Sequence, residues 1–105
     1  MEEKHLNKLY KASLQFGANW MRPLPELAKE MLPRLNESER ECLCKCVDIA
    51  RRSINEYIEK QYEYEKGLTL PEDEVVMWIS QNFPWMNKRN ISHGISQGLY
   101  YAWHG

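Results

Sequence analysis

The sequence predicts a small all-α domain of about five helices, arranged as an irregular, orthogonal bundle around one long central helix. Apolar residues recur every three or four positions almost throughout the 105 residues, and no stretch alternates long enough for a strand. Proline and glycine residues interrupt this pattern at intervals, as expected between helices. A chain of this length forms one domain with a modest core, so residues 1–105 are expected to be a single helical domain.

Two helices are predicted in the N-terminal part. The first covers Glu3–Phe16 and stops at Gly17, a favourable residue just past a helix end. Residues 18–22 then form a connector. The second begins near Pro25, a good first-turn residue, and must end or kink at Pro33, because a proline inside a helix loses a backbone hydrogen bond.

The third helix has the clearest periodicity in the chain. Asn36 and Glu39 resemble a capping box at its start, and Gly67 is expected to end it. Such a helix would be about 45 Å long, whereas a compact domain of this size has a radius of gyration of about 13 Å. The helix should therefore overhang the body, bend or pair with a partner, unless it ends soon after Tyr62.

Two further helices are predicted in the C-terminal part. Thr69 and Glu72 form a second possible capping box, and Pro84 ends the fourth helix. Asn87 is the expected N-cap of the fifth helix. The apolar side of this last helix consists of Ile91, Gly94, Ile95, Gly98, Leu99 and Ala102.

Gly94 and Gly98 are unusual on the apolar side of a helix. Each costs about 1 kcal/mol relative to alanine in a helix interior. We expect them to allow close helix packing against the first or third helix of the same chain. A close homodimer contact and room for a ligand are the alternatives.

The three cysteines do not predict a metal site. Cys42 and Cys46 lie on one helical face and Cys44 on the opposite one, so the three thiols cannot converge on a zinc ion. We expect Cys46, and Cys42 on the same face, to be small buried hydrophobes, with Cys44 exposed. The histidines are also dispersed, so no metal and no cofactor are predicted.

Charge and hydropathy indicate which classes of partner and which compartment the sequence favours. The formal net charge of −1 gives no general attraction to nucleic acid or membranes, and no apolar run could cross a bilayer. The N-terminus lacks the apolar segment of a signal peptide, which together with an odd, clustered cysteine count favours the reducing cytoplasm. An acidic face on the third helix, Glu56, Glu59 and Glu63, could attract a basic partner.

The last third of the chain is the strongest pointer to function. From Val75 to Gly105 there is no Asp or Glu, and this stretch holds six of the twelve aromatic residues. It is either the packing centre of the domain or a surface that binds something. Tryptophan, tyrosine and arginine dominate interface hot spots, and the predicted partner-binding surface is Trp85, Met86, Lys88, Arg89, Tyr101 and Trp103.

The sequence thus favours a small non-enzymatic, bacterial-type interaction or regulatory protein that binds another protein or forms a homodimer. No small-molecule substrate is predicted. The alternative is a helix-turn-helix regulator that reads DNA with Arg89, Asn90 and His93 at the start of the last helix. Its weakness is that phosphate binding normally needs many more cations. An enzyme that combines His93 with a carboxylate from residues 56–74 has the least support.

Overall fold

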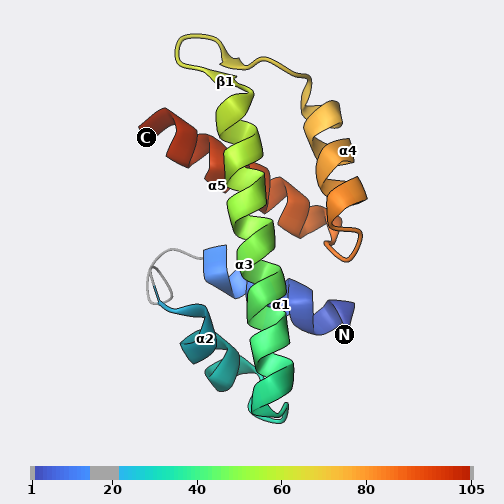
Figure 1. Ribbon diagram of the computed structural model, residues 1–105. Coiled ribbons are helices and arrows are strands. Elements are labelled where there is room, and N and C mark those ends of the chain that lie inside the picture. Colours follow the sequence, from blue (N-terminus) through green and yellow to red (C-terminus); the bar gives the residue numbers. More distant parts are fainter. Residues whose placement is uncertain (1, 15–21, 105) are drawn as a thin grey trace.

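The computed structural model describes residues 2–14 and 22–104 of the chain. Within these ranges it contains five α-helices and one short β-hairpin (Figure 1), so the predicted all-α class with about five helices is confirmed. The expected stop at Gly17 and the following connector lie mostly outside the described residues. The elements are α1 (Glu3–Leu14), α2 (Leu24–Met31), α3 (Glu37–Lys60), β1 (Tyr62–Glu63), β2 (Gly67–Leu68), α4 (Glu72–Asn82) and α5 (Lys88–His104).

Helix α3 is the spine of the molecule, and its start is held as the sequence predicts. The Asn36 side chain accepts a hydrogen bond from the Glu39 backbone N–H at 2.8 Å, and the Glu39 carboxylate accepts one from the Asn36 N–H at 3.3 Å. This reciprocal capping box satisfies two of the otherwise unpaired N–H groups of the helix start. One face of the helix is buried along its whole length, through Leu43, Val47, Ala50, Ile54 and Ile58.

Helix α3 ends close to Tyr62, the earlier of its two expected ends, and not at Gly67. The helix stops at Lys60, and Gly67 instead opens the second strand of an antiparallel hairpin in which Tyr62 pairs with Leu68. Gly67 has φ +77°, a left-handed conformation that glycine adopts without a steric penalty. The two-residue strands are too short to show as an alternating pattern in the sequence.

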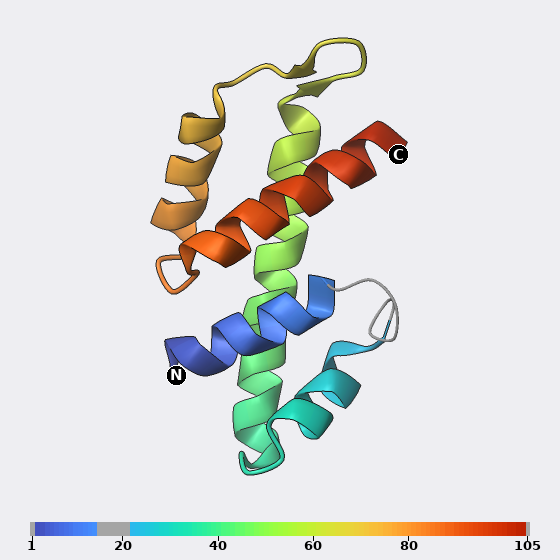
Figure 2. The ribbon, with the colours of Figure 1, turned by 180° about the vertical axis from the view of Figure 1, so that it is seen from behind.

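The other helices pack along both halves of α3, so neither half of this helix extends alone beyond the domain. Helices α1 and α5 cross the same side of α3 at different heights, as seen from behind in Figure 2. Helix α2 flanks the N-terminal half of α3, and α4 flanks its C-terminal half. Because α3 has 24 residues rather than 30, it is only about 36 Å long and fits a molecule of 45 × 28 × 18 Å.

The two glycines of α5 lie where this helix crosses its neighbours. A Cβ atom at Gly94 would collide with the hydroxyl oxygen of Tyr10 on α1, and one at Gly98 would lie 2.5 Å from Cδ1 of Ile58 on α3. Tyr10 is almost completely buried, and this burial raises its pKa above the usual value. Close packing within one chain is therefore what these glycines provide in this structure.

An asparagine network joins α1 to the turn before α5. The Asn7 side chain donates to the backbone carbonyl of Trp85 at 2.7 Å and accepts from the backbone N–H of Asn87 at 2.9 Å. The buried Asn90 side chain donates to Asn7 Oδ1, also at 2.9 Å. Asn87 accepts from the Asn90 backbone N–H, which confirms Asn87 as the N-cap of α5. The network connects groups about 80 residues apart in the chain.

Helices α2 and α4 both end where proline predicts. Helix α2 stops before Pro33, and α4 stops before Pro84. The predicted capping box of Thr69 and Glu72 is wrong, because Pro71 occupies the N-cap position of α4 without a side-chain cap. The Thr69 hydroxyl instead donates to the backbone carbonyl of Gln61 at 2.9 Å and braces the base of the hairpin. In the described ranges, no helix combines the length and the apolar character needed to cross a membrane.

The close contact between Gly94 and the Tyr10 hydroxyl can be tested by substituting Gly94 with and without the Tyr10→Phe change. Gly94→Ala should lower the free energy of unfolding by about 1 kcal/mol, because overpacking outweighs the gain in helix propensity. In a Tyr10→Phe background the nearest ring atom would be Cζ at 3.5 Å, an ordinary contact. There Gly94→Ala should stabilise the fold by about 1 kcal/mol in urea unfolding. An equal effect in both backgrounds would contradict the packing.

The asparagine network predicts that Asn90→Ala lowers the free energy of unfolding by about 2 kcal/mol, because it removes buried hydrogen bonds to Asn7. Asn82→Ala is the matched control. Asn82 is exposed and donates only within its own helix, to the carbonyl of Trp78, so its loss should cost less than about 0.5 kcal/mol. Similar urea midpoints for the two variants would show that the network does not hold the helices together.

Candidate functional site

The six residues predicted to bind a partner do not form one surface. Lys88 and Arg89 are exposed at the first turn of α5, whereas Trp103 is exposed in its last turn. Arg89 and Trp103 are fourteen residues apart, which corresponds to about 21 Å along the helix. Met86 is buried in the core, so its place on a surface is corrected. The aromatic segment thus has an inner end and an outer end with different environments.

The inner end is used for packing. The rings of Tyr57 and Trp78 stack at 4.0 Å between centroids, nearly parallel, and join α3 to α4. Edge-to-face contacts then continue from Trp78 to Phe83, from Phe83 to Trp85, and from Trp85 to Tyr10 on α1, with centroids 6.0–6.4 Å apart. We call these five residues the aromatic ladder. Such geometries are favourable beyond simple burial, and they account for Trp85 without a partner.

The outer end is open to solvent. Trp103 is 61% exposed and Tyr100 is 44% exposed in the last turns of α5, and Tyr64 on the hairpin is 77% exposed. His104 contacts the rings of both Tyr100 and Trp103, at 4.3 and 4.5 Å between centroids. Tyr101 is half-buried and accepts a hydrogen bond from Gln97 at 3.4 Å. The exposed aromatic area is therefore concentrated at one end of the molecule.

A groove of about 470 Å³ lies between the hairpin and the end of α5. We call it the hairpin groove. The hairpin contributes Tyr62, Gly67 and Leu68. None of the residues that line the groove is charged. From α5 the lining residues are Ser96, Leu99, Tyr100 and Trp103.

Of these seven lining residues, the sequence singled out only Trp103 as a binding residue. The others were missed because residues 62–67 were assigned to the long helix, so the groove had no second wall. The glycine at position 67 was the available signal, since glycine is common where a chain needs a left-handed turn residue. Leu99 was placed on the packing side of α5, and it is half-buried there.

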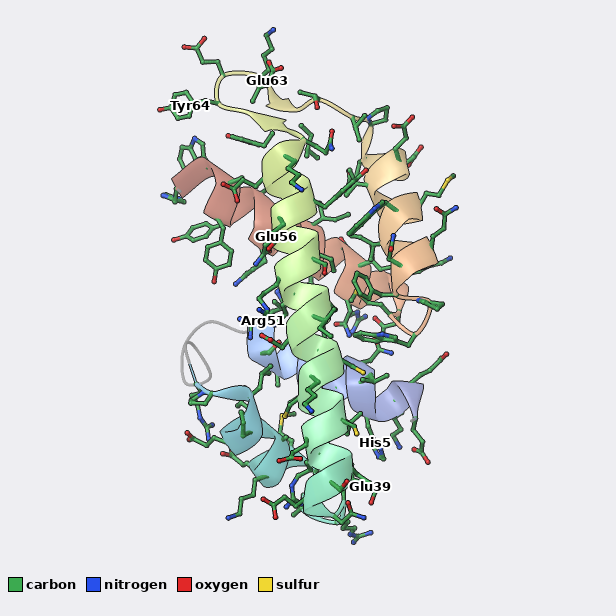
Figure 3. The ribbon with its side chains drawn as sticks, in the orientation of Figure 1. His5, Glu39, Arg51, Glu56, Glu63 and Tyr64 are labelled. Carbon is green, nitrogen blue, oxygen red and sulfur yellow. The ribbon has the colours of Figure 1, made fainter. Side chains whose placement is uncertain are left out.

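The predicted acidic face reaches the same end of the molecule but is not one helical face. Glu56 and Glu59 lie on α3, whereas Glu63 lies in strand β1, because the helix has already ended. All three are exposed, and Figure 3 places Glu63 and Tyr64 on the hairpin and Glu56 on α3. Glu63 forms an ion pair with Lys66 at 3.5 Å. Of the three carboxylates, Glu63 belongs to the hairpin that forms one wall of the groove, and none of them lines the groove itself.

The residues predicted to contact DNA differ in their exposure to solvent. Lys88 and Arg89 are exposed, and His93 is half-buried. Asn90 is only 2% exposed and is bonded to Asn7, so its role as a base-contacting residue is corrected. Of the ion pairs in the described part of the chain, none joins His93 to a carboxylate.

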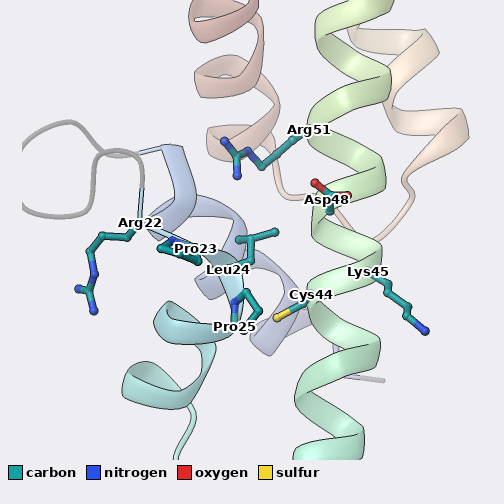
Figure 4. Close-up of a pocket in the computed structure, with 8 residues that line it drawn as sticks. All are labelled: Arg22, Pro23, Leu24, Pro25, Cys44, Lys45, Asp48 and Arg51. Atoms are coloured by element: carbon teal, nitrogen blue, oxygen red, sulfur yellow. The ribbon is translucent and has the colours of Figure 1, made fainter.

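The prediction is wrong for Cys42, which was expected to be buried, and for Cys44, which was expected to be exposed. Cys42 is exposed, whereas Cys44 and Cys46 are half-buried. Cys44 faces the start of α2, where Pro23, Leu24 and Pro25 cover it (Figure 4). Burial raises the pKa of the Cys44 thiol, which keeps it protonated and weakly nucleophilic near neutral pH.

A second cavity, of about 460 Å³, surrounds Cys44 between α2 and α3. Two of its four charged groups, Arg22 and Asp48, form ion pairs with residues outside the cavity. Arg22 binds the carboxylates of Glu26 and Glu30 at 2.7 and 2.5 Å, and this pairing lowers the pKa of Glu30. Asp48 on the cavity wall pairs with an arginine one turn along α3, at 2.5 Å. Over residues 2–14 and 22–104, no group of three or more His, Cys, Asp or Glu side chains could hold a metal ion.

Comparison of the chain with protein-family models, with curated proteins and with solved structures gave no match in any of the three. Geometry and side-chain chemistry therefore define the candidate site. Of the surfaces described, the hairpin groove combines the largest exposed aromatic groups with an uncharged lining, and Glu63 lies on the hairpin that forms one of its walls.

Proposed function

We propose that this chain is a non-enzymatic protein-binding module and that the hairpin groove is its binding site. The observation that carries the proposal is the exposure of Trp103 and Tyr100 beside an uncharged groove of about 470 Å³. Large apolar rings that remain in water cost free energy, and contiguous exposed apolar groups on small proteins commonly mark interaction sites. Tryptophan and tyrosine are also the residues that most often dominate binding energy.

The core is held together without the exposed ring of Trp103, which supports a binding role for this side chain. The aromatic ladder and the buried stripe of α3 hold the helices together without Trp103. An exposed tryptophan that adds little to the core is available to bury its ring against another protein. A side chain of this size buries 150–250 Å², which is a useful fraction of the roughly 800 Å² that each partner contributes to a standard interface.

The wider role is part of the same proposal. A bacterial-type regulatory protein that works by binding a partner, without a cofactor or a small-molecule substrate, fits a helical domain of this size. We infer the cytoplasm as its compartment, because Cys42, Cys44 and Cys46 are free thiols on one helix. The partner can be a second copy of the chain or a different protein, and the experiment below separates the two.

The proposal predicts that the immobilised chain selects peptides from a random displayed library through the hairpin groove. Trp103→Ala combined with Tyr100→Ala should abolish the enrichment, because the two most exposed rings of the groove are lost. Ile49→Ala is the matched control, since Ile49 is 54% exposed on the uncovered side of α3, away from the groove. This control should select the same peptides as the unmodified chain.

Two results would contradict the proposal. The first is that no peptide is enriched and that light scattering gives the monomer mass of 12.6 kDa at every concentration. The second is that the groove variant selects the same peptides as the unmodified chain. A mass of twice the chain, returned to the monomer mass by the groove substitutions, would identify a second copy as the partner.

A further inference from the structure

We propose that the hairpin groove binds an extended, proline-containing segment that carries arginine or lysine beside its prolines. This inference rests on the proposed function, because it assigns the chemistry of the partner that the same groove would bind. The lining of the groove, the hydrogen-bond donors on its rings and the charges of the hairpin support this ligand.

The lining suits prolyl rings better than charged or helical ligands. Tyr62, Tyr100 and Trp103 offer aromatic surface, and Leu68 and Leu99 complete the apolar walls. Proline-rich segments dock on aromatic-lined grooves because the polyproline II conformation is already formed and loses little entropy on binding. A volume of about 470 Å³ holds a few side chains of an extended segment.

The polar atoms of the groove also favour an extended backbone. The Tyr62 hydroxyl and the indole N–H of Trp103 are hydrogen-bond donors attached to the lining rings. A polyproline II segment makes no internal hydrogen bonds, so its carbonyl oxygens are available to accept from these donors. The carbonyl groups of an α-helix are already bonded within the helix.

Residues 56–66, which comprise the end of α3 and most of the hairpin, form the acidic border of the groove. Their charge indicates that the partner is cationic. Residues 56–66 contain four glutamates and two lysines, and one of these lysines, Lys66, pairs with Glu63. Among the described residues, Glu56, Glu59 and Glu65 form no ion pair. Helix α5, the other wall, contains no carboxylate side chain. A cationic residue beside the prolines would be attracted to this border, whereas the phosphates of a single-stranded nucleic acid that stacked on the same rings would be repelled.

The test is fluorescence anisotropy of labelled synthetic probes titrated with the full chain at low and high salt. The probes are a peptide of Pro-Pro-Arg repeats, the same peptide with glutamate for arginine, a Gly-Gly-Arg peptide of equal length and a single-stranded oligothymidine. We expect the Pro-Pro-Arg peptide to bind at least about tenfold more tightly than each of the others.

Two variants assign the binding to the groove. Trp103→Ala should weaken binding of the Pro-Pro-Arg peptide by about tenfold. Glu59→Lys should weaken it by about fivefold, and less at high salt. Glu41→Lys is the control for charge, because Glu41 is exposed on α3 about 27 Å from Glu59 along the helix. All variants are exposed substitutions, and their unfolding midpoints in urea confirm that they are folded.

Several results would overturn the inference. Equal binding of the Gly-Gly-Arg peptide would reduce the recognition to charge alone, and tighter binding of oligothymidine would make the ligand a nucleic acid. Equal weakening by Glu41→Lys and Glu59→Lys would remove the role of the acidic border. If the displayed library yields groove-dependent peptides that are acidic or helical, this inference fails while the proposed function stands. If the library yields no groove-dependent peptide, both fail.

Discussion

The close crossing of α5 over α3 and α1 is the constraint on which the rest of the structure depends. Gly98 leaves the space that Ile58 of α3 fills, and Gly94 leaves the space for the hydroxyl of Tyr10. The hydrogen bonds between Asn7 and Asn90 then fix the first turn of α5 against α1. With one end held and the middle pressed against α3, the direction of the helix is set. The position of Trp103 beside the hairpin follows from that direction.

This constraint divides the aromatic residues into two groups with different consequences. Near the start of α5, the ladder from Tyr57 to Tyr10 fills the spaces between α1, α3 and α4. Beyond the crossing, Leu99, Tyr100 and Trp103 line the groove opposite the hairpin, and Tyr100 and Trp103 stay exposed. The sequence left open whether the C-terminal segment is a packing centre or a binding surface. Its first part packs in the core, and its last part remains exposed as a candidate binding surface.

The starts of α3 and α5 and the two proline stops were predictable because they depend on local chemistry, whereas the predicted capping box of α4 was wrong. The capping box of Asn36 and Glu39 and the cap at Asn87 formed as predicted. The end of α3 was not predictable from periodicity, because Tyr62 continues the apolar stripe although its backbone is extended. The burial of Asn90 and Met86 depends on partners far away in the chain. The groove was missed for the same reason, since its two walls meet only through the tertiary fold.

The most direct measurement is acrylamide quenching of tryptophan fluorescence in the unmodified chain and in Trp103→Phe and Trp78→Phe variants, with the mass determined by light scattering on the same samples. The account predicts that, in samples with the mass of the monomer, Trp103→Phe removes the most red-shifted and most readily quenched emission. Trp78→Phe should remove shielded emission, because Trp78 stacks on Tyr57. If Trp103→Phe leaves the quenching unchanged, the outer aromatic end is already covered, and the hairpin groove is not the open site described.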